Sequence, residues 1–182
     1  MKTKKSIELT SDGYFPNRTE ECGICSLANL IYIKYQDFET AKKLFEKSKE
    51  HPLVEINGTT KVYILPKILE DLSDHKYSGI AYIPPTFDIS KEYDESSKIS
   101  FDSLKKVFQN NLEKGLINLE EKCEIDGPHG IFIRNKDNNM GHMFVNIDNK
   151  SEKTFVNNGY LSTFPEGNNE LCGIFEITKH HQ

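Results

Sequence analysis

The chain has 182 residues with 23 basic and 28 acidic side chains, which gives a formal net charge of −5. This length suggests one domain, and a chain of this size can bury roughly 70% of its unfolded surface. The mild acidity argues against a nucleic-acid partner, because no excess of Lys and Arg is present to displace phosphate counterions. No apolar run approaches the roughly 18 residues of a membrane-spanning helix, so we expect no membrane partner.

The ends of the chain and its cysteines indicate the compartment. Residues 1–13 read as an extended lead-in and 178–182 as a polar tail, both part of a single domain over 1–182. The N-terminus is basic but lacks the apolar segment of a secretory signal. We therefore expect a cytoplasmic protein, or one exported without a Sec-type signal peptide. In that setting we expect reduced thiols. The cysteines are Cys22, Cys25, Cys123 and Cys172.

The first two thirds of the chain are predicted to be mainly helical. Apolar residues at spacings of three and four predict helices over 22–35, 38–49, 65–73 and 101–115. Pro52 follows the second helix, and Gly115 occupies a C-cap position at the end of the fourth. Residues 79–84 read as a strand, and the charged stretch 88–100 reads as a surface loop.

The last third is rich in strands. Alternating apolar runs predict strands over 130–134, 141–147, 153–157 and 171–177, with turn-forming residues between them. Helices followed by strands are typical of the α+β class and not of a doubly wound parallel sheet. We therefore predict N-terminal helices that pack on a C-terminal antiparallel sheet.

Cys22 is the leading candidate nucleophile. It opens the first predicted helix, where the helix dipole favours a thiolate by roughly 0.3–1 kcal/mol. The thiolate is the nucleophilic form, so we expect alkylation of Cys22 well below the usual thiol pKa of about 8.5. Gly23 would leave space beside the sulfur for a substrate carbonyl. Cys25, three residues further on and one turn deeper, is the alternative nucleophile.

His142 is the predicted base. Along its strand it points to the face opposite Met143. The next strand returns antiparallel and brings Asn157 or Asn158 back beside it. A thiol needs a base, and the base needs an orienting group on its other ring nitrogen. We predict a triad of Cys22, His142 and Asn158, with Asn157 as the alternative third member.

The order of a Cys at a helix start, then His, then Asn resembles papain-like cysteine hydrolases. The segment from Glu21 to Leu30 is similar to the motif D-C-G-x-A-C-L-A-M-I of C39-type bacteriocin-leader peptidases, in which the first cysteine is the nucleophile. It also resembles the C-G-x-x-S-L pattern of phytochelatin-synthase-like proteins. C39 peptidases have Asp as the third member of the triad, where this chain has Asn. The resemblance implies a papain-like fold and the activity of a thiol protease.

Papain-fold toxins and effector glutamine deamidases are similar at Asn17 and around His142 and Phe144. That resemblance implies deamidation of a protein partner by the same triad. Papain-like enzymes commonly place a Gln six residues before the nucleophile, where it donates to the oxyanion. This chain has Pro16 there, so Asn17, the nearest amide donor, is the oxyanion candidate.

We therefore predict a cysteine-dependent amide hydrolase, most simply a stand-alone C39-like peptidase that acts on a peptide or protein and needs no cofactor or metal. A glutamine deamidase effector or toxin is the alternative. Cys-x-x-Cys pairs also occur in zinc sites and redox proteins, and a binding module without catalysis is a further reading. His129 is the second candidate for the base. The sequence leaves the oligomeric state open.

Overall fold

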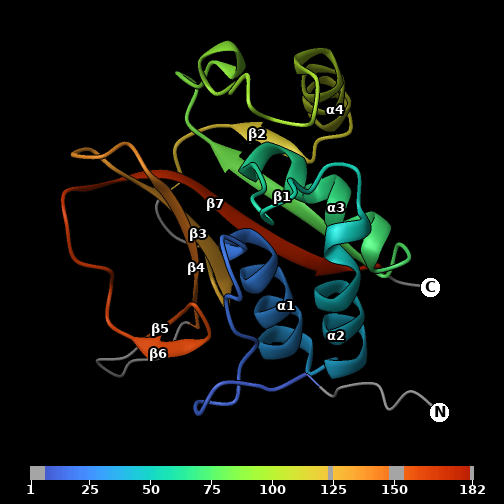
Figure 1. The fold of residues 1–182 in the computed structure, drawn as a ribbon, viewed down its shortest axis with the longest axis vertical. Helices are drawn as coiled ribbons and strands as arrows, with labels where there is room; N and C mark the ends of the chain where they lie inside the picture. The colour runs from blue at the N-terminus through green and yellow to red at the C-terminus, as the bar shows by residue number, and fades with distance from the viewer. Residues whose placement is uncertain (1–6, 123–124, 148–153, 181–182) are drawn as a thin grey trace.

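The computed structural model describes residues 7–122, 125–147 and 154–180. Within this part the chain forms four α-helices and one seven-stranded sheet (Figure 1), which confirms the α+β class. Cys123, the ends of the predicted lead-in and tail, and the start of the predicted strand at 153 lie outside the described residues.

The four predicted helices are confirmed, with ends that differ by at most two residues. They are α1 (Cys22–Tyr35), α2 (Phe38–Lys47), α3 (Leu65–Leu72) and α4 (Phe101–Glu113). Side chains cap two of them at the start. Asp37 accepts a hydrogen bond from the backbone of Thr40 in α2, and Ser100 accepts one from Ser103 in α4. A short 3₁₀ turn over 48–50 continues α2.

The sheet is mixed and not purely antiparallel. Its strands are β1 (Tyr77–Ile83), β2 (Ile117–Leu119), β3 (His129–Asn135), β4 (Gly141–Asn146), β5 (Phe155–Asn157), β6 (Tyr160–Ser162) and β7 (Asn169–Lys179). They lie in the order β2-β1-β7-β3-β4-β5-β6. Among the strands that the structure describes, only β1 and β2 pair in parallel. Parallel strands need a crossover, and α4 supplies it.

Three strand predictions are therefore corrected. The three-residue strands β2 and β6 went unpredicted, because so short a run shows no alternation. The sheet is not confined to the C-terminal part, since β1 and β2 lie among the helices in the chain. The tail predicted from residue 178 begins later, because β7 continues to Lys179 and pairs with the start of β1.

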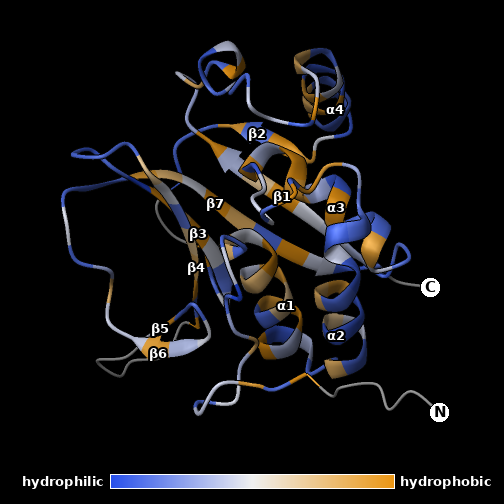
Figure 2. Cartoon of the chain, in the orientation of Figure 1, coloured by the Kyte–Doolittle hydropathy of each residue, from blue (hydrophilic) through white to orange (hydrophobic). Residues whose placement is uncertain are grey.

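The main core lies between one face of the sheet and the helices α1, α2 and α3 (Figure 1). α1 is buried along most of its length and is apolar on nearly every side (Figure 2), as expected of a helix covered by a sheet and by a second helix. A smaller cluster on the other face consists of Ile131, Ile133 and Phe144, with Phe155 against them. No helix in the described part of the chain has the length and apolarity to cross a membrane.

Two features of this fold position the candidate site. The start of α1 lies against the sheet at β4. The strands β4 and β5 pair with Val145 opposite Val156, which brings the end of β5 back toward the start of β4. Asn158 and Gly159 then turn the chain into β6 with φ of 53° and 91°. Positive φ at both central residues is typical of a type I′ hairpin turn, for which Asn-Gly is the preferred pair.

Candidate active site

Cys22 is the first residue of α1, and its side chain is only partly buried. Burial raises the pKa of its thiol above the ordinary value. The backbone N–H groups of Met143, Gly23 and Cys22 itself face the sulfur and act in the opposite direction. They offset part of the burial effect, because hydrogen bonds to a thiolate favour the charged form. The helix start and β4 thus supply donors around the sulfur.

The expectation of a lowered thiol pKa is nevertheless wrong for this structure. The loss of solvent around Cys22 outweighs the three N–H groups, and the charge of Glu20 raises the thiol pKa further. The resting thiol is therefore protonated, and its reactivity depends on a base that removes the proton.

His142 lies on β4 directly before Met143, whose N–H faces the Cys22 sulfur. The sulfur therefore faces the peptide group that joins His142 to Met143, while the His142 side chain points to the face of the strand opposite Met143. The imidazole Nε2 lies 2.5 Å from Oδ1 of Asn157, and the ring stacks on Phe144 with centroids 6.1 Å apart. An amide oxygen only accepts, so this contact assigns the proton to Nε2 and leaves the lone pair on Nδ1.

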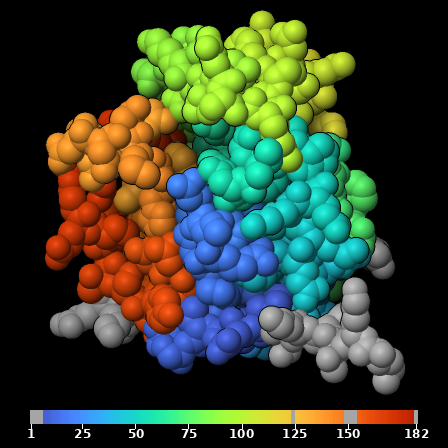
Figure 3. All heavy atoms as spheres, viewed as in Figure 1, coloured from blue at the N-terminus to red at the C-terminus, as the bar shows by residue number. Residues whose placement is uncertain are grey.

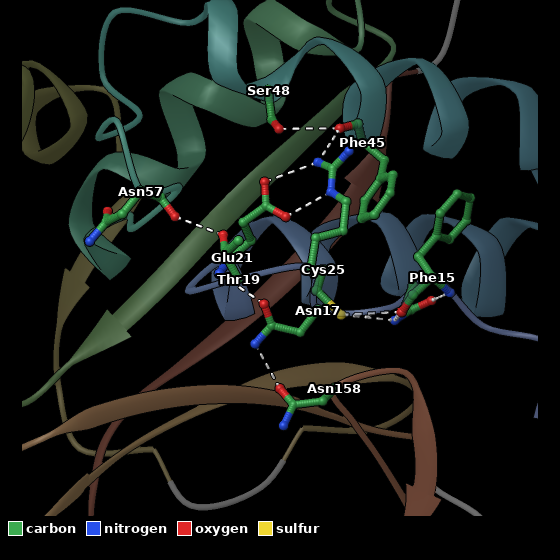
Figure 4. A network of polar contacts seen from close by, with 11 residues as sticks. Phe15, Asn17, Thr19, Glu21, Cys25, Phe45, Ser48, Asn57 and Asn158 are labelled. Carbon is green, nitrogen blue, oxygen red and sulfur yellow. Dashed lines mark hydrogen bonds and ion pairs between the residues drawn. The ribbon is translucent and has the colours of Figure 1, made fainter. Parts of the chain in front are cut away.

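The structure corrects the preferred third member of the triad. Asn157, and not Asn158, contacts the imidazole. Asn158 instead accepts a hydrogen bond of 2.9 Å from Nδ2 of Asn17 (Figure 4). The reason is the hairpin. Asn157 is the last strand residue, whereas Asn158 has left the strand for the turn, where the positive φ redirects its side chain.

Asn17 lies at the start of α1, as an oxyanion donor would require. Its Oδ1 accepts the backbone N–H of Glu21, and its Nδ2 donates to Asn158 (Figure 4). The amide nitrogen carries two hydrogens, so one N–H remains beyond the bond to Asn158. Asn17 thereby links the nucleophile-bearing helix to the β5–β6 turn.

A buried ion pair at the helix start was missed at the sequence level. Glu21, the residue before Cys22, is fully buried and accepts two hydrogen bonds from Arg18, at 2.8 and 2.9 Å. Arg18 also donates to the carbonyl of Phe45 (Figure 4). Gly58 has a φ of +93° and lies directly against the Glu21 side chain, where a Cβ would overlap it. The sequence signal for this ion pair was the presence of two opposite charges three residues apart, Arg18 and Glu21.

Gly23 does not leave open space for a substrate. A Cβ at this position would lie 2.1 Å from Oγ1 of Thr60. The glycine is therefore required because the segment around residue 60 packs directly on the helix start. This contact replaces the predicted role of Gly23.

Cys25 is placed in the core. It is 2% exposed, its Sγ lies 3.2 Å from the carbonyl of Phe15, and Asn29 donates to the sulfur at 3.5 Å. Burial, followed by the charges of Cys22 and Glu21, raises its pKa to about 12. A thiol so enclosed and so hard to ionise is a poor nucleophile.

The structure places two further residues on other strands of the sheet. His129 is buried at the start of β3, with Nδ1 2.9 Å from the carbonyl of Gly127. Cys172 lies on β7 and is partly buried. Within the described ranges, no three His, Cys, Asp or Glu side chains are grouped so that they could hold a metal ion.

A cavity of about 320 Å³ is lined by residues that neighbour those around Cys22 in the chain and in the sheet. One wall includes Lys61, the residue after Thr60, which contacts the helix start at Gly23. Its lining also includes Phe132, the cross-strand partner of Met143. Figure 3 shows the hollow between the orange hairpin of β3 and β4 and the cyan and green segments that follow α2.

Comparison with known protein families, with curated proteins and with solved structures gives no match to this chain.

Proposed function

We propose that this protein is a cysteine-dependent amide hydrolase of the papain-like kind, and specifically a peptidase, with Cys22 as nucleophile, His142 as base and Asn157 as the group that orients the imidazole. One observation carries the proposal. Nε2 of His142 is occupied by Oδ1 of Asn157, so the basic nitrogen is Nδ1, which points away from Asn157. The residue after His142 on the same strand, Met143, directs its backbone N–H toward the Cys22 sulfur.

The chemistry follows from these positions. When a peptide occupies the site, Nδ1 of His142 takes the thiol proton while the Cys22 sulfur bonds to the scissile carbonyl carbon. The oxygen becomes an oxyanion, and we assign its stabilisation to the backbone N–H groups around the Cys22 sulfur and to the remaining N–H of Asn17. His142 then protonates the leaving amine, and a thioester forms. Water, deprotonated by His142, hydrolyses the thioester and restores the thiol.

The raised thiol pKa fits this sequence of steps. A thiol that stays protonated at rest needs the base at the moment of attack, and Asn157 keeps the imidazole in the tautomer that can accept the proton. Asn157 acts only through His142, so it is a positioning residue.

The test is incubation of the purified protein with a mixture of denatured and folded proteins, followed by mass spectrometry. New termini indicate a peptidase, and the mass gain of an amide-to-acid exchange indicates deamidation by the same triad. We expect new termini with the wild type and none with Cys22→Ala.

His142→Ala is expected to lower the turnover by about 10²–10⁴-fold, the usual contribution of a general base. Because His142 lies outside the main core, the variant should keep its melting temperature. Cys25→Ala is the matched cysteine control and should retain turnover. An unaltered substrate mixture with every variant and with the wild type would overturn the proposal.

A further inference from the structure

Two residues that line the 320 Å³ cavity each carry a buried polar atom without a hydrogen-bond partner in the described chain. They are the hydroxyl of Tyr63 and Nε of Arg134. Both residues line the cavity, Tyr63 from the 3₁₀ turn η2 (Val62–Ile64) and Arg134 from the end of β3. Buried polar groups are almost always paired, so two unpaired ones on the walls of one cavity call for an explanation.

The geometry of Arg134 shows which donor is left over. Its two terminal nitrogens donate to the two carboxylate oxygens of Glu92, at 3.2 and 2.5 Å. This end-on pairing uses the terminal N–H groups and leaves the Nε–H without an acceptor.

The Tyr63 ring is 1% exposed and held in place by Phe87 and Phe108, with centroids 5.5 and 5.7 Å away. Burial raises the pKa of its phenol, and the charge of Glu92 does so further. The hydroxyl therefore stays protonated and keeps its proton for donation.

A ligand that enters the cavity and pairs with both donors must bring an acceptor oxygen. The lining carries four acidic side chains, Asp88, Glu92, Glu121 and Glu170, against the three basic ones of Lys61, Lys91 and Arg134. Arg134 is already paired with Glu92, so the remaining charge of the cavity disfavours a carboxylate. An apolar group would leave both donors unpaired, which costs affinity. A carboxamide satisfies both sides, since its oxygen accepts from Tyr63 and Arg134 and its NH₂ group can donate to the acidic residues.

We propose that this cavity is the substrate subsite for a Gln or Asn side chain, held by the Tyr63 hydroxyl and the Arg134 Nε–H. The inference rests on the proposed function for its role in hydrolysis. Two lining residues neighbour groups of the Cys22 site: Lys61 follows Thr60, which contacts Gly23, and Phe132 pairs across the sheet with Met143. A peptide with its scissile bond at Cys22 can therefore place a neighbouring side chain there, because an extended chain advances about 3.3 Å per residue.

The experiment measures binding to the Cys22→Ala protein by amide NMR, so that it does not depend on hydrolysis. The probes are the N-acetyl methylamides of glutamine, glutamate and methionine, which have side chains of similar length. We expect the glutamine compound to shift the amide signals of the cavity walls in a saturable manner, with the other two at least about tenfold weaker.

Two variants locate the donors. Tyr63→Phe and Arg134→Lys should each reduce the affinity for the glutamine compound about tenfold and abolish its advantage over methionine. Tyr77→Phe is the matched control, because its hydroxyl already donates to Asp37 at 2.7 Å, far from the cavity walls. It should lower the melting temperature and leave binding unchanged, whereas Tyr63→Phe should not lower the melting temperature.

Equal binding of methionine, tighter binding of glutamate, or the absence of any saturable shift would overturn the subsite. Retained glutamine preference in both variants would do the same. Absence of hydrolysis by the wild type, combined with glutamine-selective binding, would instead refute the proposed function and leave the subsite in place.

Discussion

At the residue scale, the two adjacent asparagines at the end of β5 have different tasks. Asn157 contacts the imidazole of His142, and Asn158 contacts Asn17 on the segment before α1. One residue of difference changes the direction of the side chain, because the first lies in the strand and the second has φ of 53° in the turn.

Asn157→Ala is expected to lower turnover by about tenfold to hundredfold, since an imidazole that is free to rotate loses part of the 10²–10⁴-fold effect of a general base. Asn158→Gly is the control, because glycine accepts the positive φ and removes only the contact to Asn17. Steady-state kinetics on a substrate found by the mass-spectrometric screen would measure both. A larger loss for Asn158→Gly would show that the Asn17 contact matters more than the imidazole contact.

The thiol of Cys22 should show an alkaline reactivity profile. Burial raises its pKa above the ordinary value of 9.0, so the thiolate fraction should still be rising at pH 9. The rate of alkylation by iodoacetamide at Cys22, followed by peptide mapping, should accordingly increase across the neutral and alkaline range. A plateau below pH 7 would indicate a resting ion pair of thiolate and imidazolium, contrary to this structure.

At the element scale, α1 carries the nucleophile and is clamped at its start by neighbouring segments. Glu21 is held by Arg18, and Gly23 lies in direct contact with Thr60. Since the other wall of the site is the strand β4, the position of α1 between these elements sets the geometry around Cys22.

Gly23→Ala should lower the free energy of unfolding by about 1–3 kcal/mol, the usual cost of overpacking. The cause is the overlap of the new Cβ with Oγ1 of Thr60, while the Cβ of Thr60 is 3.5 Å away and tolerable. The double variant Gly23→Ala, Thr60→Ala should therefore regain most of the loss. Urea denaturation of the four proteins of this cycle would measure the coupling. Additive effects would mean that Thr60 is not the obstacle.

At the scale of the whole molecule, the fold buries several weak acids in their neutral form. Burial raises the pKa of Cys25 to about 12, and the pKa values of Cys22, Tyr63 and Tyr77 are raised as well. The unfolded chain ionises these groups first, so it binds fewer protons than the folded chain in alkaline solution. Stability then falls as the pH rises.

For Cys25 this loss begins near its ordinary value of 9.0 and continues to about 12. Each such group contributes at most about 1.4 kcal/mol per pH unit. Chemical denaturation at a series of pH values should show this decline, with a shallower slope for Cys25→Ala. An identical slope in the variant would mean that the Cys25 thiol ionises in the folded state as easily as in the unfolded chain.

The sequence by itself determined the helices, most of the strands and the residue types of the site. Helical spacing is visible in any run of about ten residues, so α1, α2, α3 and α4 were all predictable. The alternation around His142 correctly placed it opposite the core residue Met143.

Only the tertiary structure decided which groups meet. The choice of Asn157 over Asn158 depends on where β5 ends and the turn begins. The raised thiol pKa of Cys22 depends on how much water the packed elements exclude, which local sequence does not encode. The parallel pairing of β1 with β2, the contact of Thr60 with Gly23 and the cavity with two unpaired donors all join segments distant in the chain. Local sequence patterns do not reveal such contacts, because the residues that make them come together only when the chain has folded.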